Sequence, residues 1–113
     1  MKIFSSESKE LHPIASTTIW EYDIPSEALS FAKAHINGRY PEKGMVMNSE
    51  CEEIYFVMSG SGVVHSEKGD YPIIQGDIYH FEKGEKYWTE GSDLELILVN
   101  SPAWTPEQAK SVE

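Results

Sequence analysis

The second half of the chain alternates between short apolar runs and polar turns. The predicted turns are SGSG at 59–62, EKGD at 67–70, QGD at 75–77, EKGE at 82–85 and TEGSD at 89–93. Between them lie the runs IYFVM, GVVHS, YPII, DIYHF, KYWT and LELILVN, which are rich in β-branched and aromatic residues. Short strands at this spacing predict an all-β sandwich or barrel. Pro72 is expected at an edge or a strand start, because proline has no backbone N–H to donate.

The N-terminal third shows two competing patterns. TTIWEYDI at 17–24 alternates as a strand does. In contrast, SEALSFAKAHING at 26–38 places apolar residues at helical spacing between a capping Ser26 and a terminating Asn37-Gly38. The same segment also fits period-two alternation, so the residues alone leave helix and strand open.

The C-terminal residues have the pattern of a helix start. In Thr105-Pro106-Glu107-Gln108, Thr105 is the candidate N-cap, proline occupies the first helical position, and Gln108 completes a capping box. This pattern predicts a short terminal helix. Trp104 comes directly before it and is expected to pack the helix against the rest of the fold rather than to stack on a ligand.

Length and charge narrow the class of protein. A chain of 113 residues suits one domain over 1–113. Nine Lys and Arg against nineteen Asp and Glu give a formal charge of −10, so we expect neither a nucleic acid nor a membrane as partner. The first residues contain no apolar stretch of about 7–15 residues typical of a secretory signal. The single cysteine, Cys51, excludes an internal disulfide, and we expect a cytoplasmic protein.

Two stretches resemble the paired motifs of the cupin superfamily. In EEIYFVMSGSG, Glu53 and Gly60 match the Glu and the strand-closing Gly of the first motif. GDIYHFEKGEKYWTEG follows the second motif, and the residues in register are Gly76, Asp77 and Gly84. The resemblance covers about residues 38–101. It implies a double-stranded β-helix, or jelly-roll barrel, to which the terminal pattern adds a short C-terminal helix.

The resemblance also bears on the N-terminal third and on assembly. Because the family has a strand where local propensity favours a helix, we predict a strand over 26–37. Small cupins commonly form dimers, so the resemblance implies a homodimer.

The histidines that hold a metal in metal-binding cupins are replaced in this chain. An H-x-H pair normally precedes the conserved Glu, and with the usual spacer it falls on Met47 and Ser49. If the spacer is one residue longer, it falls on Val46 and Asn48. The third histidine, in the second motif, is replaced by Tyr87. One carboxylate and a phenol bind divalent iron, manganese or zinc weakly at neutral pH, so no cofactor is expected.

A rebuilt metal site is the alternative. Strand alternation points Cys51 and Glu53 inward, and Glu50 and Glu52 outward. His80, in DIYHF, is placed to approach Glu53 from a neighbouring strand. The alternative is therefore a divalent metal on Cys51, Glu53 and His80, although buried histidines and cysteines are more often structural.

The inward positions form a mixed apolar and polar lining. Its predicted members are Met47, Ser49, Glu53, Tyr55, His80 and Tyr87, with Trp88 near the mouth. Such a lining suits a small ligand with sugar-like polarity, unless side chains fill the barrel completely. Arg39, in the turn GRYPEKG, is either an anion contact at the mouth or a partner of surface acids.

Glu53 is the predicted catalytic residue, together with Tyr87. A carboxyl group inside a barrel, without a metal or an ion-pair partner, is expected to have a raised pKa. Such a group serves as a general acid or base. The alternative is a structural carboxylate that accepts hydrogen bonds from Tyr87 or from backbone groups.

Three functions are compatible with these residues, and they leave open whether the protein is an enzyme. The preferred one is a small-molecule-binding cupin with a metal-poor pocket, extended by isomerase- or epimerase-like proton transfer. The second is a metal-dependent oxygenase or isomerase that uses Cys51, Glu53 and His80. The third is a non-catalytic module for dimerisation or partner binding.

Overall fold

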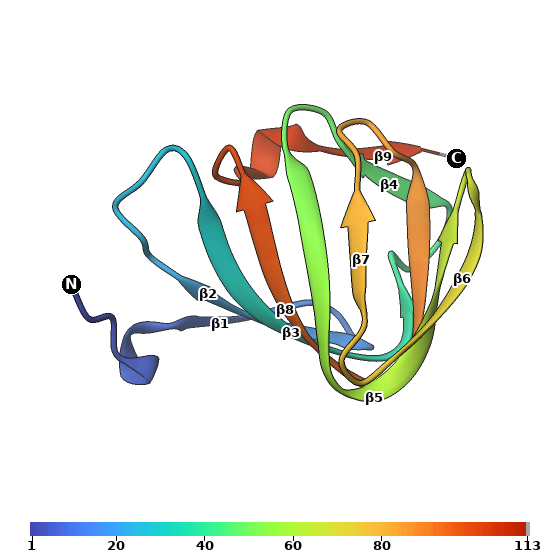
Figure 1. Ribbon diagram of the computed structural model, residues 1–113, viewed down its shortest axis with the longest axis horizontal. Helices are drawn as coiled ribbons and strands as arrows, with labels where there is room; N and C mark the ends of the chain where they lie inside the picture. Colours follow the sequence, from blue (N-terminus) through green and yellow to red (C-terminus); the bar gives the residue numbers. More distant parts are fainter. Residues whose placement is uncertain (113) are drawn as a thin grey trace.

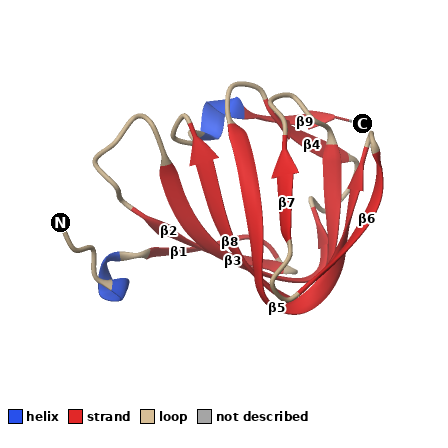
Figure 2. Cartoon of the chain, viewed as in Figure 1, coloured by secondary structure: helices blue, strands red, loops and turns tan. Residues whose placement is uncertain are grey.

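A computed structural model describes residues 1–112 of the chain, and within that range nine antiparallel strands curl into a barrel (Figures 1 and 2). The strands are β1 (Lys9–Ile14), β2 (Thr17–Tyr22), β3 (Ser30–Tyr40), β4 (Met45–Asn48), β5 (Glu52–Ser66), β6 (Gly69–Ile74), β7 (Ile78–Phe81), β8 (Tyr87–Ser101) and β9 (Ala109–Val112). Two short 3₁₀ turns are η1 (Ser5–Glu7) and η2 (Pro106–Gln108). The predicted all-β jelly-roll barrel is confirmed.

Strand β8 is the centre of the fold, because it pairs with β3, β4 and β5. The sheet continues from β3 through β2 to β1, and β5 also pairs with β6 and β7. Strand β9 pairs with β4 and extends the opposite edge. The N-terminal strands β1 and β2 project to one side of the barrel, whereas the C-terminal strand lies beside β4 (Figure 1).

Strands β5 and β8 are both 15 residues long and pair along their whole length. The turns predicted at 59–62 and 89–93 lie inside these strands, so those two predictions are wrong. Gly62 and Gly91 are directly opposite each other where the paired strands bend. A Cβ atom on Gly91 would lie 2.4 Å from the carbonyl oxygen of Ile36, so the bend brings a third strand into close contact. The sequence therefore shows glycines typical of turns, but here they permit close strand packing.

The other strand and turn predictions agree with the structure. The turns at 67–70, 75–77 and 82–85 connect β5 to β6, β6 to β7, and β7 to β8. Pro72 lies in β6, which within residues 1–112 pairs with β5 alone and is therefore an edge strand.

The ambiguous segment 26–37 is a strand from Ser30 onward, and the helical alternative is wrong. Its backbone is paired on both sides, with β2 and with β8. These long-range pairs outweigh the local helical propensity.

The predicted short C-terminal helix begins where expected but is only a single 3₁₀ turn. Residues Pro106–Gln108 form a single 3₁₀ turn, and the chain then continues as β9. The side chain of Thr105 makes no capping hydrogen bond, and the Gln108 amide donates to the carbonyl of Ala103 at 3.0 Å. Pairing of β9 with β4 gives this segment a sheet partner that the local pattern cannot reveal.

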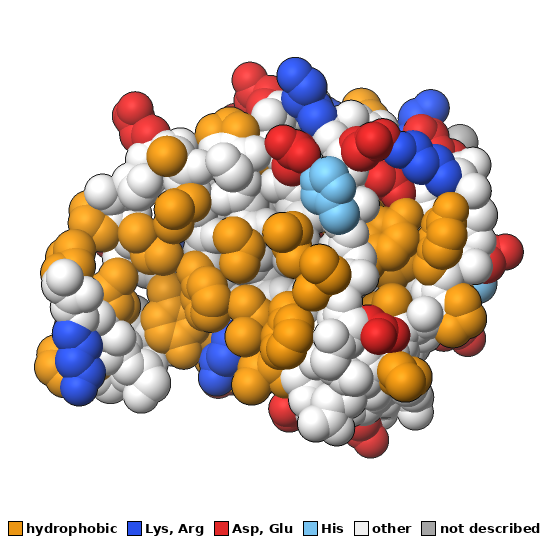
Figure 3. Space-filling view, in the orientation of Figure 1, with side chains coloured by type: hydrophobic (Ala, Val, Ile, Leu, Met, Phe, Trp, Pro, Cys, Tyr) orange, Lys and Arg blue, Asp and Glu red, His pale blue; other side chains and the backbone are white. Residues whose placement is uncertain are grey.

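The core and the outer face follow the alternation of β5. One part of the barrel interior is filled by Val57, Val64, Ile73, Phe81 and Leu94. The outward positions of β5 and β7 carry exposed apolar side chains, namely Ile54, Phe56, Met58 and Ile78. Hydrophobic side chains gather over this face in Figure 3. No helical segment in residues 1–112 is long and apolar enough to cross a membrane.

Candidate ligand-binding site

A cavity of about 560 Å³ lies inside the barrel. Its walls come from η1, from β1 to β5, from β8 and β9, and from the segment before η2. The buried residues of its deep end are Asn48, Glu53, Tyr55, Tyr87 and Asn100. Exposed residues at its open end include Glu7, Lys9, Asp23 and Leu29. The interior is therefore not filled by side chains, and its volume suits a small molecule.

Glu53 reaches the deep end because β5 alternates between the two faces of the sheet. Its neighbours Glu52 and Ile54 are exposed, whereas Glu53 is only 7% exposed. Its Oε1 accepts hydrogen bonds from the side-chain amides of Asn48 at 3.1 Å and Asn100 at 2.8 Å. No side-chain hydrogen bond from residues 1–112 reaches Oε2. The carboxyl group thus keeps one oxygen for a molecule in the cavity.

Trp104 fixes the orientation of the Asn48 amide. The indole Nε1–H of Trp104 donates to Asn48 Oδ1 at 3.0 Å. An indole can only donate, so Oδ1 must face Trp104 and the NH₂ group must face Glu53. Oε1 of Glu53 therefore acts as an acceptor whatever its protonation state, and the proton of the neutral acid resides on Oε2. Trp104 also lines the cavity, directly before the 3₁₀ turn η2 in the chain.

Burial raises the pKa of Glu53, and the hydrogen bonds from Asn100 and Asn48 oppose that rise. Within the described part of the chain, Glu53 forms no ion pair with a Lys, Arg or His side chain. Its neutral form is therefore populated at higher pH than that of an exposed glutamate. Such a carboxyl group can donate a proton when neutral and accept one when ionised.

Three tyrosines line the cavity near Glu53: Tyr40 on β3, Tyr55 on β5 and Tyr87 on β8. Burial raises the pKa of all three hydroxyl groups, and the charge of Glu53 adds to the rise. They stay protonated at neutral pH. The Tyr55 hydroxyl shares a hydrogen bond with Thr89 Oγ1 at 3.0 Å. The Tyr40 hydroxyl has no side-chain hydrogen bond among residues 1–112 and is free to contact a ligand.

Strand β4 follows the second of the two predicted alignments. Val46 and Asn48 are each 8% exposed and line the cavity. Met47 and Ser49 are half-buried and lie outside the lining, so their prediction as lining residues is wrong. The spacer before Glu53 is one residue longer than usual, and this shift turns the opposite face of the strand inward.

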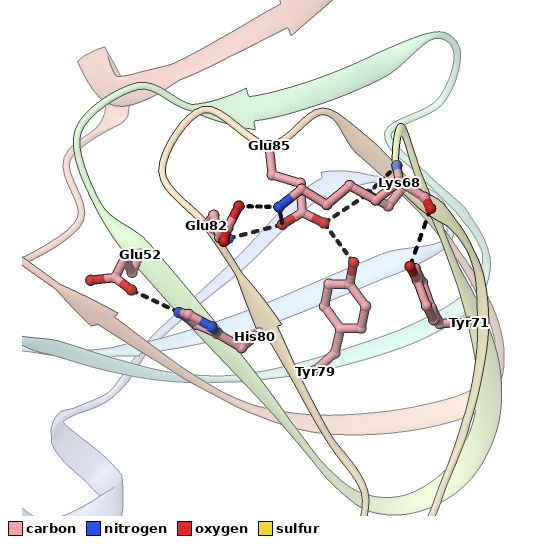
Figure 4. A network of polar contacts seen from close by, with 8 residues as sticks. Glu52, Lys68, Tyr71, Tyr79, His80, Glu82 and Glu85 are labelled. Atoms are coloured by element: carbon pink, nitrogen blue, oxygen red, sulfur yellow. Dashed lines mark hydrogen bonds and ion pairs between the residues drawn. The ribbon is translucent and has the colours of Figure 1, made fainter.

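His80 lies on the outer face of the barrel. In the pairing of β5 with β7, Phe81 is opposite Glu53, and His80 is opposite the outward-facing Ile54. The Nε2 atom of His80 is 2.7 Å from Oε1 of Glu52, and Figure 4 shows the ring turned toward that carboxylate. The prediction that His80 lines the cavity is wrong, because the register of β7 is fixed by its partner strand.

The donor set does not fit a cupin metal centre. Cys51 is buried, and its sulfur accepts a hydrogen bond from Asn100 at 3.3 Å, but His80 is outside the barrel. The alternative set of Cys51, Glu53 and His80 therefore does not converge. Within residues 1–112, no group of three or more His, Cys, Asp and Glu side chains is arranged so that it could hold a metal ion. The positions of the family's histidines carry an apolar side chain, a carboxamide and a phenol, none of which replaces an imidazole.

Arg39 and Trp88 are predicted at the mouth, but both lie outside the cavity lining. The guanidinium group of Arg39 donates to the carbonyls of Pro41 at 3.1 Å and Gly44 at 2.5 Å. It also lies 4.0 Å from the ring centroid of Trp88, which stacks on the ring of His65 at 3.9 Å. Arg39 therefore stabilises its own turn, and it neither lines the cavity nor pairs with an acidic side chain of residues 1–112.

Two residues of the site, Asn100 and Tyr40, are not among those predicted from the sequence. Asn100 continues the inward series of Leu94, Leu96 and Leu98, so alternation along LELILVN indicates its position. For Tyr40 no comparable pattern exists, because its place depends on the pairing of β3 with β8.

A second buried carboxylate lies outside the cavity, between β7 and β8 (Figure 4). Glu85 accepts hydrogen bonds from Ser66 at 2.7 Å, the Tyr79 hydroxyl at 2.5 Å and the backbone N–H of Glu82 at 2.9 Å. Burial raises its pKa, but the hydrogen bonds more than offset this, and the pKa of Glu85 is lowered. Burial and the bond to Glu85 raise the pKa of Tyr79 to about 12. With its oxygens occupied, Glu85 holds this turn in place.

A curled antiparallel barrel, with a glutamate on β5 and residues of β4 and β8 facing one cavity, defines a cupin fold. The predicted resemblance to the cupin superfamily is confirmed at the level of the fold by solved structures. No family model matches the chain.

Two solved structures illustrate the likeness. A single-residue variant of Streptomyces Pac13 with uridine has a TM-score of 0.89 and 18% identity, over 100% of this chain and 90% of Pac13. Pac13 is described as a nucleoside dehydratase. A variant of Bacillus subtilis oxalate decarboxylase has a TM-score of 0.82 and 17% identity, over 98% of this chain and 32% of the enzyme. At these identities the likeness shows the fold alone.

One curated relative matches part of the sequence. The oxalate-binding protein of Thermotoga maritima is 38% identical over 50 residues, which are 42% of this chain and 41% of that protein. The matched segment thus spans less than half the length of the relative. Proteins with this fold therefore include both small-molecule binders and enzymes.

Proposed function

We propose that the protein binds a small polar metabolite of sugar-like or nucleoside-like structure in this cavity and transfers a proton to or from it through Glu53. The observation that carries this proposal is the free Oε2 atom of a carboxyl group that is 7% exposed. Oε2 has no side-chain hydrogen bond among residues 1–112, so a ligand in the cavity can form one with it without breaking a hydrogen bond within the protein.

The chemistry requires only groups of this chain. Ionised Glu53 removes a proton from a carbon next to a carbonyl group, and the electron pair of the C–H bond is taken up by the carbonyl system. In an isomerase the proton returns from Oε2 to carbon. In a dehydratase the electron pair forms a C=C bond as a hydroxyl group leaves the neighbouring carbon, and that group takes the proton from Oε2 and departs as water. Both reactions return Glu53 to its ionised form.

The tyrosines contribute by donating hydrogen bonds. Because burial raises the pKa of Tyr40 and Tyr87, their hydroxyl groups stay protonated and can stabilise negative charge that develops on a carbonyl oxygen. The uridine in the Pac13 structure and the dehydratase activity described for Pac13 support a nucleoside or a related sugar as the ligand class.

Proton transfer can be tested without knowing the product. Neutral nucleosides and sugars that carry a carbonyl group would be incubated with the protein in D₂O, and loss of carbon-bound protons would be followed by NMR. We expect the wild type to exchange a proton of at least one compound, and Glu53→Gln to slow this exchange by roughly 10²-fold or more. The matched control is Glu52→Gln, which changes the neighbouring exposed carboxylate and is expected to match the wild type.

Two results would count against the proposal: binding and exchange that survive Glu53→Gln unchanged, or no binding of any compound. A non-catalytic module for dimerisation or partner binding is less well supported, because that role has no use for a cavity of about 560 Å³. We further propose the homodimer and the cytoplasmic location expected from the sequence, without nucleic acid or membrane partners. Sedimentation velocity tests whether the protein is a homodimer.

A further inference from the structure

The cavity wall carries mostly negative charge. Its carboxylates are Glu7, Glu21, Asp23 and Glu53, and its one ammonium group within the described chain is that of Lys9. Neither His nor Arg contributes to the lining formed by residues 1–112. A phosphate or carboxylate group on a ligand therefore meets like charge at both ends of the cavity.

The positive charge of Lys9 is partly offset by the negative charge of Glu21. In the pairing of β1 with β2, Lys9 is directly opposite Glu21, so the two side chains lie on the same face of the sheet. Opposite charges in this arrangement attract each other, and the field of Lys9 toward the cavity is weakened. The half-buried Glu21 faces inward with Thr17 and Ile19, which also line the cavity.

The deep end offers polar groups that suit an uncharged ligand. Oε2 of Glu53 and the hydroxyl of Tyr40 both lack a side-chain hydrogen bond among residues 1–112, and both residues line the cavity. A neutral Oε2–H group donates a hydrogen bond and an ionised Oε2 accepts one, while a tyrosine hydroxyl does both. Ligand hydroxyl and carbonyl groups match these atoms in either state, whereas an anionic group is repelled by ionised Glu53.

From this arrangement we infer that the cavity selects uncharged, hydroxyl-bearing molecules and rejects their phosphorylated or carboxylated counterparts. The inference rests on the proposed function for the location of the site, and it adds the class of ligand. It also predicts that this chain rejects oxalate, the anion named in the description of the Thermotoga maritima relative.

Matched pairs of ligands test the inference. Isothermal titration calorimetry would compare uridine with uridine 5′-monophosphate, and galactose with galacturonate, and oxalate would be added as a small dianion. We expect each anionic member to bind roughly tenfold or more weakly than its neutral partner at low ionic strength. The ratio of neutral-ligand to anionic-ligand affinity is expected to fall at about 0.5 M salt, because salt screens the charges at the open end of the cavity.

Charge variants give a second readout. Glu21→Gln leaves Lys9 unopposed and is expected to lower the ratio of uridine to uridine monophosphate affinity by about threefold or more. Lys9→Gln is expected to raise that ratio. Glu27→Gln makes the same change in net charge at an exposed residue outside the lining and is expected to leave the ratio unchanged.

The outcomes separate this inference from the proposed function. Tight binding of oxalate, or equal affinities within both pairs, would overturn the inference while leaving a binding site in place. Absence of binding by every neutral compound would overturn both. The Glu53→Gln variant could keep the preference for neutral ligands and lose neither binding nor proton exchange. That result would uphold the inference and contradict the catalytic role of Glu53.

Discussion

At the scale of single residues, the two oxygens of one carboxyl group have different environments. Oε1 of Glu53 is held by the amides of Asn48 and Asn100, and Trp104 orients the first of these amides. Oε2 has no side-chain hydrogen bond among residues 1–112, and Glu53 lines the cavity. This asymmetry directs the proton of the neutral acid toward a ligand, which a glutamate with both oxygens bound cannot do. Glu85 shows the contrast, because its oxygens are occupied by Ser66, Tyr79 and Glu82.

Replacement of Glu53 by Gln is expected to change how stability depends on pH. Because burial raises the pKa of folded Glu53 above its usual value of 4.5, its contribution to stability is fully present below about pH 4.5 and is lost as pH rises through the folded pKa. Glutamine stays neutral, so the variant should gain stability relative to the wild type as pH increases. Each unit of pKa elevation corresponds to about 1.4 kcal/mol. Urea denaturation from pH 4 to 9 measures the difference, and parallel curves would contradict the raised pKa.

At the scale of elements, alternation within a strand was easier to predict than the register of its neighbours. The alternation predicted from Glu50 through β5 correctly placed Cys51, Glu53 and Tyr55 inside and Glu50 and Glu52 outside. The same reasoning failed at His80 and at Met47, because a register error of one residue exchanges the two faces of a strand. The register of β7 is set by β5, and that of β4 by β8 and β9. A single sequence does not specify these partners.

The register of β4 can be tested by building a metal site. Histidines at Val46, Asn48 and Tyr87, which line the cavity with Glu53, should bind Zn²⁺ or Mn²⁺ through three imidazoles and a carboxylate. Each variant would be compared with and without metal. Metal at about 100 times its Kd should stabilise this variant by about 2.7 kcal/mol.

The matched control places histidines at Met47, Ser49 and Tyr87, two of which lie outside the lining. It should show little metal-induced stabilisation. If the triple variant does not fold, the pair Asn48→His and Tyr87→His serves the same comparison. Stronger metal binding by the control than by the test variant would mean that the register is wrong.

At the scale of the whole molecule, the bend shared by β5 and β8 makes the barrel. These two long strands remain paired through the bend, so residues before it and after it contribute to opposite walls. Glu53 lies before the bend of β5, and Tyr87 lies before the bend of β8, at the other end of the paired strands. Curling of the strand pair brings both residues to one cavity.

Gly91→Ala tests the bend. The added methyl group would lie 2.4 Å from the carbonyl oxygen of Ile36, which belongs to β3 and cannot move without disturbing its strand pairs. We expect a loss of at least about 2 kcal/mol in the free energy of unfolding, with a fall in Tm of roughly 5–10 °C by calorimetry. Ser92→Ala, at the exposed neighbouring residue, should change the Tm by less than about 2 °C. A Gly91→Ala variant as stable as the wild type would show that the close approach is not required.

The sequence by itself determined the β class, most of the strands and the burial of Glu53. Period-two alternation and turn residues are local properties, and the spacing of two short motifs identified the fold. Only the tertiary structure decided that the strand predicted over 26–37 begins at Ser30, that the C-terminal residues form β9, and that Asn48, Asn100, Tyr40 and Trp104 line the cavity with Glu53 instead of Met47, Ser49 and His80. The physical reason is that strand partners and their register arise from hydrogen bonds between segments far apart in the chain, which local propensity does not encode.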